Sequence, residues 1–461
     1  MKNIVIPQRY ESIINKISTT AKETGFDAYI VGGFVRDLLI KREPEDLDIM
    51  VSNKLNDKDG RSAGINFSKL LTTKYKLHNP VTFTKFGTSK LFIDNEEVEF
   101  VMPRKEYYSK YSRNPHTQLA SLEQDALRRD FTINALFLRL TDMKILDLTF
   151  HGIDDIKNKI IRVADTQNAE IIFKQDPLRI FRAVRQSLQL GFTIEPKTYA
   201  AMKISVPRIN IVSNERIRNE INKILIEKKP SKAFKMMDEI NILIKILPEL
   251  ARLNTLKQYE KHHIENLFID TMEVLDKVRD DLILRMSALL HNIGNAYKNE
   301  DDKIHFYSNN STGVKEAVII LKRLIYSKEF IQKTISVIQN NISAIRSSDW
   351  TDGSVRKFVK RCGSELDLIM EFSKVYFNNN KNYAKFIKLK RRIKDLKSKN
   401  TLYIKPEPLT GREMMNIFNM PAGKWIKKAK NKIEEMQIEN PNLTKAEAIE
   451  AVKEILTTSM I

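Results

Sequence analysis

The sequence predicts an α+β head of about 150 residues followed by an all-α remainder. In residues 1–150, short apolar runs with alternating or β-branched residues are interspersed with segments of helical spacing. After about Gly152 the strand signals fade, and apolar residues recur at helical spacing as far as the C-terminus. A chain of 461 residues, of which 42% are hydrophobic, is long enough for roughly two to four domains.

Individual elements of the head follow from local patterns. Residues 11–25 have the apolar spacing of an amphipathic helix, which ends at Gly25. Strands are predicted where β-branched or alternating apolar residues occur in short runs, at 28–33, 46–51, 90–93, 98–103 and 144–148.

Composition restricts the class of protein. The chain has 78 Lys and Arg against 58 Asp and Glu, a net charge of +20, which favours a nucleic-acid partner. An AT-rich genome that favours Lys codons is the alternative explanation. A single cysteine, Cys362, excludes a disulfide framework and a Cys-based zinc site. No stretch is apolar enough for a membrane span and the N-terminus lacks a signal-peptide core, so we expect a cytoplasmic protein with no membrane partner.

Residues 381–399 form a basic segment near the C-terminus, with nine Lys and Arg and the single acid Asp395. Phe386, Leu389, Ile393 and Leu396 keep a helical apolar stripe. The segment therefore predicts a one-sided basic helix suited to a phosphate backbone, although a solvated helix face remains an alternative. The RNA-contacting residues predicted here are Lys388, Lys390, Arg391, Arg392 and Lys394.

The stretch 29–51, "YIVGGFVRDLLIKREPEDLDIMV", concentrates phosphate and metal chemistry. Asp46 and Asp48 are two residues apart and, if Asp48 begins a strand, point to the same face. Two hard oxygen ligands on one edge can share a pair of Mg²⁺ ions, an arrangement that suits in-line phosphoryl transfer. Gly32 and Gly33 allow a backbone to approach a phosphate closely before a short helix, and Arg36 adds a charge-assisted contact.

These residues are similar to a known family. "VGGFVRDLL" followed by "DLDIMV" resembles the signature of class II tRNA nucleotidyltransferases and bacterial poly(A) polymerases. The resemblance continues through "VEFVMPRKEYYSKYSRNP", "RRDFTINALF", "QDPLRIFRAVRQSLQLGF", "SNERIRNEINKIL" and "LTGREMMNIFNMPAGKWI" in the family's order. It implies a polymerase beta-like nucleotidyltransferase head at 1–150, a helical neck with the base-selecting helix at 151–228, a helical body at 229–360 and an RNA-binding tail at 361–461.

The resemblance also implies site residues. Asp46 and Asp48 match the catalytic metal-binding carboxylates, while Glu99, among apolar residues, is open to two interpretations: a third metal-side carboxylate or a structural acid. Asp130 and Asn134 have the i, i+4 spacing by which one helix would present an acceptor and a donor to a ribose hydroxyl. The implied nucleotide-binding residues outside the base-selecting helix are Gly32, Gly33, Arg36, Asp37, Arg128, Arg129, Asp130 and Asn134.

Base choice is expected at Asp176 and Arg179, whose i, i+3 spacing would place them on one helix face. An acceptor beside a donor complements the exocyclic amine and ring nitrogen of cytosine or adenine, and it mismatches uracil and guanine. The alternative is a surface ion pair. The family usually has an acid at the position of Gln175, and a neutral amide there predicts a weaker hold on Arg179 during the change from C to A.

A second catalytic site is predicted to be lost. "LLHNIGNAYK", residues 289–298, resembles the HD phosphohydrolase segment of many relatives, and such a site needs His and Asp ligands. His291 is retained, but Asn292 stands at the Asp position. Asp270, Asn309 and Asn341 stand where His residues would be expected.

The function implied is addition of C, C and A from CTP and ATP to the acceptor end of tRNA by an Mg²⁺-dependent enzyme, without a nucleic-acid template. Three alternatives stay open. One is a poly(A) polymerase or a CC-only or A-only enzyme on the same scaffold, although no "GRRF"-like run follows Asp48. The others are a non-catalytic RNA-binding protein and an HD phosphohydrolase. The sequence does not indicate an oligomeric state.

Overall fold

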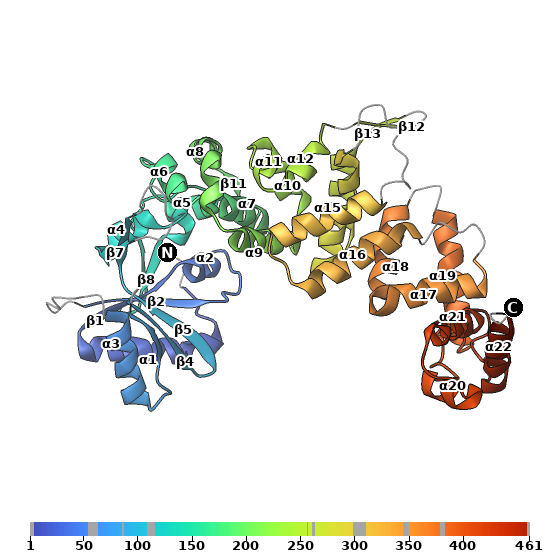
Figure 1. Ribbon diagram of the computed structural model, residues 1–461. Coiled ribbons are helices and arrows are strands. Elements are labelled where there is room, and N and C mark those ends of the chain that lie inside the picture. The colour runs from blue at the N-terminus through green and yellow to red at the C-terminus, as the bar shows by residue number, and fades with distance from the viewer. Residues whose placement is uncertain are drawn as a thin grey trace. The chain divides into compact units, whose positions relative to one another are not determined.

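The structure of this protein, a computed structural model, describes residues 4–53, 63–84, 87–107, 116–255, 257–260, 263–297, 310–343, 350–378 and 383–458. The chain forms two compact units, Met1–Ile246 and Leu247–Ile461. The first contains a seven-stranded sheet and the second is mostly helical (Figure 1), which confirms the predicted α+β head and helical remainder. No helix among the described residues is both long and apolar enough to cross a membrane.

The head is built on the seven-stranded sheet. All neighbouring strands are antiparallel except β2 and β5, which run parallel. The predicted strands fall on β1, β2, β4, β5 and β9, whereas β3 and β8 are only three and four residues long and give no clear sequence signal. In spatial order the strands are β3 (Val81–Phe83), β4 (Thr88–Ile93), β5 (Glu96–Val101), β2 (Leu47–Asn53), β1 (Phe26–Val31), β8 (Leu136–Arg139) and β9 (Lys144–Asp147).

One face of this sheet is covered by two helices, α1 (Gln8–Thr24) and α3 (Ala63–Tyr75) (Figure 1). Alternate strand residues pack against them, for example Ile49 of β2 against the core that contains Phe67 of α3. The helix α1 ends where predicted, because Gly25 adopts φ +73°, a left-handed conformation that favours glycine.

The described residues cover the other face of the sheet over only part of its width. Tyr29, Val31, Met50 and Phe137 form a second apolar cluster with Ala126 of α4 (Leu122–Arg128). These four residues belong to β1, β2 and β8 in the middle of the sheet. Asp48 lies on this second face, beside the edge of the cluster.

Further elements of the first unit connect the sheet to a set of helices. A hairpin of β6 (Arg104–Tyr107) and β7 (His116–Leu119) precedes α4, and the strands β10 (Ile160–Ile161) and β11 (Thr193–Ile194) pair in parallel. The helices are α2 (Gly33–Leu39), η3 (Thr132–Asn134), α5 (Gly152–Asn158), α6 (Ala169–Gln175), α7 (Leu178–Leu190), α8 (Pro196–Ser205), η4 (Val206–Ile211), α9 (Asn214–Leu225), α10 (Ser231–Glu239) and α11 (Leu243–Ile246).

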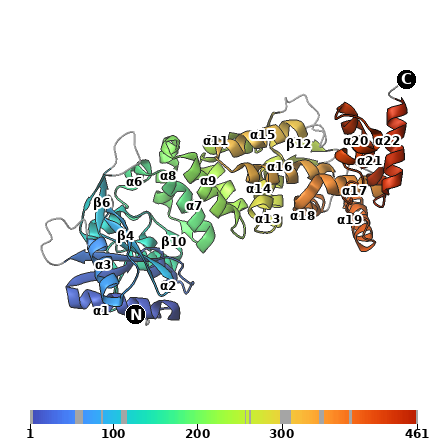
Figure 2. The ribbon, with the colours of Figure 1, turned by 60° about the horizontal axis from the view of Figure 1, so that its bottom comes forward.

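The second unit is a series of packed helices with one small hairpin, β12 (Lys257–Glu260) and β13 (His263–Asn266). Its last three helices form a bundle around a separate apolar core (Figure 2). The helices are α12 (Pro248–Arg252), α13 (Leu267–Lys277), α14 (Leu282–Leu290), η5 (Ile293–Tyr297), α15 (Asn310–Arg323), α16 (Lys328–Ser343), α17 (Asp352–Cys362), η6 (Gly363–Glu365), α18 (Leu366–Phe377), α19 (Tyr383–Ser398), α20 (Gly411–Phe418), α21 (Lys424–Glu439) and α22 (Lys445–Thr458).

Candidate functional site

The two carboxylates of the DxD motif flank the first residue of β2. Asp46 precedes the strand and is exposed, and Asp48 is its second residue. Leu47, between them, is buried in the core on the opposite face. Asp48 is in register with Glu99 on the parallel strand β5, so these two side chains lie on the same face of the sheet. The strand order thereby brings Glu99 beside Asp48, although the two are far apart in sequence.

The surroundings of Asp48 disfavour its ionised form. Burial, and then the negative charges of Glu99 and Asp46, raise the pKa of Asp48 to about 6, although Arg129 acts in the opposite direction. A hard divalent cation would relieve this repulsion, because carboxylate oxygens are the ligands that Mg²⁺ prefers. Within the described ranges, no three His, Cys, Asp or Glu side chains form a ready ligand set. The carboxylate oxygens of this site therefore suit a metal ion whose remaining ligands are water molecules or substrate phosphates.

Gly32 lies next to these carboxylates because the chain turns sharply between β1 and α2. It adopts φ +78°, a conformation that residues with a side chain rarely adopt. A Cβ atom on Gly32 would be 3.5 Å from Nη1 of Arg129 and 3.8 Å from Oδ2 of Asp48. The glycine therefore keeps the space over the carboxylate and the guanidinium group open.

Arg36 and Asp37, in α2, are held by internal contacts. Nε of Arg36 donates to Oδ1 of Asp37 at 2.9 Å, and Nη1 donates to Oδ1 of Asn134 at 2.7 Å. Burial raises the pKa of Asp37, and Arg36 opposes this shift. The guanidinium group of Arg36 thus orients the amide of Asn134 by donating to its oxygen.

Asp130 and Asn134 are in contact but do not share an α-helix, so that prediction was wrong. The helix α4 ends at Arg128, and Asn134 belongs to the short η3. The reason is tertiary pairing, since the N–H of Thr132 donates to the carbonyl of Arg162 at 2.9 Å and draws the backbone out of the helix. The side chains still meet, with Nδ2 of Asn134 donating to Oδ1 of Asp130 at 2.9 Å.

The pair Arg128 and Arg129 is held by a carboxylate that sequence reasoning missed. Asp125 is fully buried and accepts from Nη2 of Arg128 at 2.6 Å and from Nε of Arg129 at 3.0 Å. The sequence does contain a signal for these contacts. Asp125 stands three residues before Arg128 and four before Arg129, a spacing that brings side chains together on a helix. Glu106 of β6 also pairs with Arg128, at 3.1 Å. Among the nearby cations, Arg129 has the largest effect in lowering the pKa of Asp48.

Asp176 and Arg179 do not share a helix face, which corrects the predicted geometry. Asp176 lies between α6 and α7 in an extended conformation, because the residue before Pro177 is disfavoured in a helix. Its Oδ1 accepts from the N–H of Leu178 at 3.3 Å and its Oδ2 is 3.6 Å from Nη2 of Arg216. Arg179 is buried instead against the segment after α4.

The helix α7 presents a row of polar side chains to that segment. Nη2 of Arg179 donates to the carbonyl of Arg128 at 2.7 Å, and Nε of Arg182 donates to Oδ2 of Asp130 at 2.8 Å. Gln186 accepts from Nδ2 of Asn134 at 3.0 Å. Sequence reasoning missed Arg182 and Gln186, although their spacing of three and seven residues from Arg179 places all three on one face of α7.

Asp130 is the centre of this network. Burial alone would raise the pKa of Asp130, but the charge of Arg182 and the hydrogen bond from Asn134 hold the pKa well below its ordinary range. Asp130 is therefore a buried carboxylate that stays ionised because its partners are in place.

In the HD-like segment, Asn292 and Asp270, two of the residues at the positions of the expected metal ligands, contact each other. Nδ2 of Asn292 donates to Oδ2 of Asp270 at 3.1 Å, and Nδ1 of His291 donates to the carbonyl of Ala288 at 2.7 Å. Burial lowers the pKa of His291, which favours the neutral ring. Asn341 is buried, and Asn309 lies outside the described residues. The amide of Asn292 thus donates to a carboxylate at the position where a metal site would need an acidic ligand.

The basic helix is present as α19, with Phe386, Leu389 and Leu396 buried. Arg392 is paired with Asp352 and, at 3.1 Å, with Asp395. The other four predicted RNA contacts are exposed, namely Lys388, Lys390, Arg391 and Lys394.

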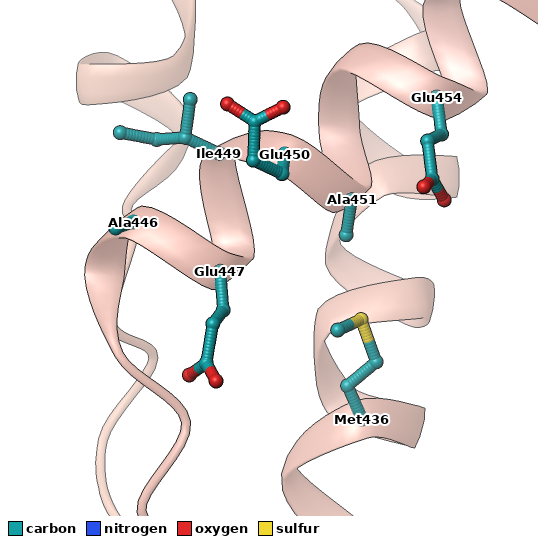
Figure 3. Close-up of a pocket in the computed structure, with 7 residues that line it drawn as sticks. All are labelled: Met436, Ala446, Glu447, Ile449, Glu450, Ala451 and Glu454. Carbon is teal, nitrogen blue, oxygen red and sulfur yellow. The ribbon is translucent and has the colours of Figure 1, made fainter.

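A groove of about 530 Å³ lies between α21 and α22 (Figure 3). Met436 faces Ala451 across it, and Glu447, Glu450 and Glu454 line it. This acidic lining disfavours a phosphate backbone, so the groove is not a candidate for the nucleic-acid site.

Two segments of the chain match families of known proteins. Residues 28–162 match the family described as "Poly A polymerase head domain", and residues 191–253 match "Probable RNA and SrmB- binding site of polymerase A". The chain is 31% identical to the A-adding tRNA nucleotidyltransferase of Geobacter sulfurreducens, over 60% of this chain and 29% of that protein. It is 35% identical to the CCA-adding enzyme of Leuconostoc mesenteroides, over 51% of this chain and 55% of that enzyme. These two alignments span only about a third to a half of the relatives' lengths.

A more distant relative aligns over most of its length. The mitochondrial CCA tRNA nucleotidyltransferase of Saccharomyces cerevisiae is 27% identical, over 93% of this chain and 88% of that protein. Among solved structures, the CCA-adding enzyme of Bacillus stearothermophilus in complex with CTP superposes with a TM-score of 0.67 at 21% identity, over 99% of this chain and 100% of that chain. At that identity the superposition supports the fold alone.

Proposed function

We propose that this chain is a nucleotidyltransferase that adds C, C and A from CTP and ATP to the 3′ end of tRNA, because residues 28–162 match the family described as "Poly A polymerase head domain". No nucleic-acid template takes part, since the protein itself selects the nucleotide. The similarity to CCA-adding and A-adding enzymes supports the substrate class.

The observation that carries the proposal is the group formed by Asp48, Glu99, Gly32 and Arg129. A carboxylate pair in register on neighbouring strands, an open glycine turn and a partly buried cation beside them suit a triphosphate held beside a metal. A non-catalytic RNA-binding protein would gain nothing from carboxylates that repel one another on the face that approaches a polyanion.

Asp46 and Asp48 would hold Mg²⁺ in a two-metal site, and the bound metal would activate the attacking hydroxyl and neutralise charge on the triphosphate. Glu99 lies beside Asp48 and would add negative charge that favours a metal there. The open space at Gly32 would admit a phosphate close to Arg129, whose charge opposes that of the phosphate oxygens.

The nucleotide's sugar would lie by Asp130 and Asn134. These two are positioned by Arg36 from α2 and by Arg182 and Gln186 from α7. Because each hydrogen bond fixes one atom of the pair, both side chains are already oriented before a ribose arrives.

Base choice would involve Asp176 and Arg179, at the start of α7. Nη1 of Arg179 makes only a long contact, 3.4 Å, to the carbonyl of Arg129, which leaves donor capacity toward a base. The carboxylate of Asp176 would accept from the exocyclic amine of cytosine or adenine. The neutral side chain of Gln175 would assist Arg179 only weakly.

The remaining parts follow the proposed division into head 1–150, neck 151–228, body 229–360 and tail 361–461. The exposed cations of α19 would bind the tRNA backbone. The HD-like segment would serve as a scaffold, and we keep a cytoplasmic location as part of the proposal.

The test is incubation of the full chain with tRNA that ends before CCA, with each NTP supplied singly and then in combination, followed by sequencing of the 3′ ends. Products ending in CCA support the proposal, whereas no extension with any NTP overturns it. The Geobacter relative favours one alternative, an A-only enzyme, which would extend only tRNA that already ends in CC.

A further inference from the structure

The row of residues that contains Asp48 continues across the sheet to its edge. Asp48 of β2 is in register with Glu99 of β5, Glu99 with Lys90 of β4, and Lys90 with Val81 of β3. Paired residues on neighbouring strands point to the same face, so all four side chains lie on the face of the carboxylates. The adjoining rows bring Phe83, paired with Thr88, and Phe92, paired with Glu97, to that same face.

This part of the face is exposed, although its side chains are apolar. Val81 is 60% exposed, Phe83 is 41% exposed and Phe92 is 60% exposed. The apolar cluster around Met50 and Ala126 covers only the neighbouring strands. A solvated sheet face normally carries polar residues, and a group of exposed large apolar residues marks a binding surface.

The charges on this face favour bases over phosphates as its ligand. Nζ of Lys90 is 2.5 Å from Oε1 of Glu97, so its charge is already compensated. Glu99 and Asp48 follow in the same row. Aromatic rings stack with any nucleobase, and they do so without regard to sequence.

We infer that Val81, Phe83 and Phe92 form a stacking platform for the last unpaired bases at the 3′ end of the RNA, beside the carboxylates Asp46 and Asp48. The inference rests on the proposed function, because that function places an RNA 3′ hydroxyl at these carboxylates. RNA that reaches Asp48 along this face passes over the exposed rings. The rings hold the terminal bases, and the 3′ hydroxyl then lies beside the carboxylates Asp46 and Asp48.

The experiment measures binding without chemistry. A tRNA that ends before CCA and carries 2-aminopurine as its terminal base is titrated with the full chain, with no NTP present. Stacking on a ring quenches 2-aminopurine emission. The variant Phe83→Leu/Phe92→Leu keeps apolar side chains but removes both rings, and we expect it to lose most of the quench and to bind about tenfold more weakly.

A matched control is Phe150→Leu. Phe150 is 85% exposed and follows β9, at the edge of the sheet opposite to β3, so its loss should leave the quench and the affinity unchanged. The single variant Phe92→Leu should show a smaller effect in the same direction. In steady-state addition, the double variant should raise KM for tRNA with KM for CTP unchanged.

Unchanged quench and affinity in the double variant would overturn the platform. A second outcome would overturn it as well. If wild type is a dimer in sedimentation and the double variant is a monomer, a second copy of the chain covers this face. A different result would contradict the proposed function alone. If the wild-type chain quenches 2-aminopurine emission but never extends tRNA, the platform is supported and the assigned reaction is wrong.

Discussion

Arg182 of α7 donates from Nε to Oδ2 of Asp130 at 2.8 Å, and this pair ties the helix after Pro177 to the segment that follows α4. Through Asp130 the same contact reaches Asn134 and, from there, Arg36. Four side chains from three separate parts of the chain are therefore oriented by one another, on the nucleotide side of the proposed site.

The variant Arg182→Ala should weaken both nucleotide binding and stability. The substitution leaves the buried carboxylate of Asp130 without Arg182, its main partner. Because Arg182 is partly exposed, we expect the free energy of unfolding to fall by about 1–3 kcal/mol. KM for CTP should rise more than KM for tRNA. The measurements are steady-state kinetics and urea unfolding, with Arg139→Ala as control, because Arg139 is a partly exposed arginine of the same head that pairs with Asp142. Equal behaviour of the two variants would contradict the positioning role.

The same pair predicts a dependence of stability on pH. The pKa of Asp130 in the folded protein lies below its ordinary value of about 4, so its contribution is fully present above that value. The contribution is lost as pH falls through the lower, folded pKa. Urea unfolding of wild type and Asp130→Asn should therefore differ most near neutral pH and converge in acid. A difference that grows as pH falls would show that Asp130 is not ionised in the folded state.

The variants Asp46→Asn and Asp48→Asn should each abolish nucleotide addition while tRNA binding survives. Loss of metal-assisted chemistry is worth several kcal/mol, so we expect a decrease of roughly a thousandfold or more. The control is Asp142→Asn, an acid in the turn after β8 that pairs with Arg139. Near-normal turnover in both DxD variants with Mg²⁺ present would mean that the reaction occurs elsewhere.

Nucleotide choice should change in Asp176→Ala and Arg179→Ala. Each would remove one proposed contact to the base, at a cost of about 1–3 kcal/mol to correct addition, and UTP or GTP should enter at a higher relative rate. Gln175→Glu should leave C addition intact and sharpen A addition. The measurement is kcat/KM for all four NTPs on tRNA at each intermediate stage. Unaltered selectivity in both alanine variants would assign base recognition to other residues.

The exposed cations of α19 should contribute to RNA affinity through counterion release. Lys390→Gln/Lys394→Gln should weaken tRNA binding and reduce the slope of log affinity against log salt by roughly one unit per lost phosphate contact. The control is Lys157→Gln/Lys333→Gln, in which both lysines are paired with acids. If both double variants have the wild-type slope, α19 is only a solvated face.

The sequence alone predicted several features that depend on neighbours along the chain. Gly25 ends α1 because a left-handed residue is needed there, and apolar spacing predicted the change from a mixed head to helices. The association of Gly32 with the Asp46–Asp48 pair was also predictable, because glycine turns and paired carboxylates are local signals. Such signals are enough to indicate phosphate and metal chemistry at this stretch of the chain.

Only the tertiary structure decided which distant side chains meet. The parallel pairing of β2 with β5 sets Glu99 beside Asp48, and the packing of α7 on the segment after α4 joins Arg182 to Asp130. Local spacing gave a wrong prediction where such packing decided the conformation. Asn134 does not lie on a helix with Asp130, as the i, i+4 spacing suggested, because the backbone of Thr132 pairs with that of Arg162. Strand order and helix packing are set by burial of apolar surface over the whole chain, which no short pattern contains.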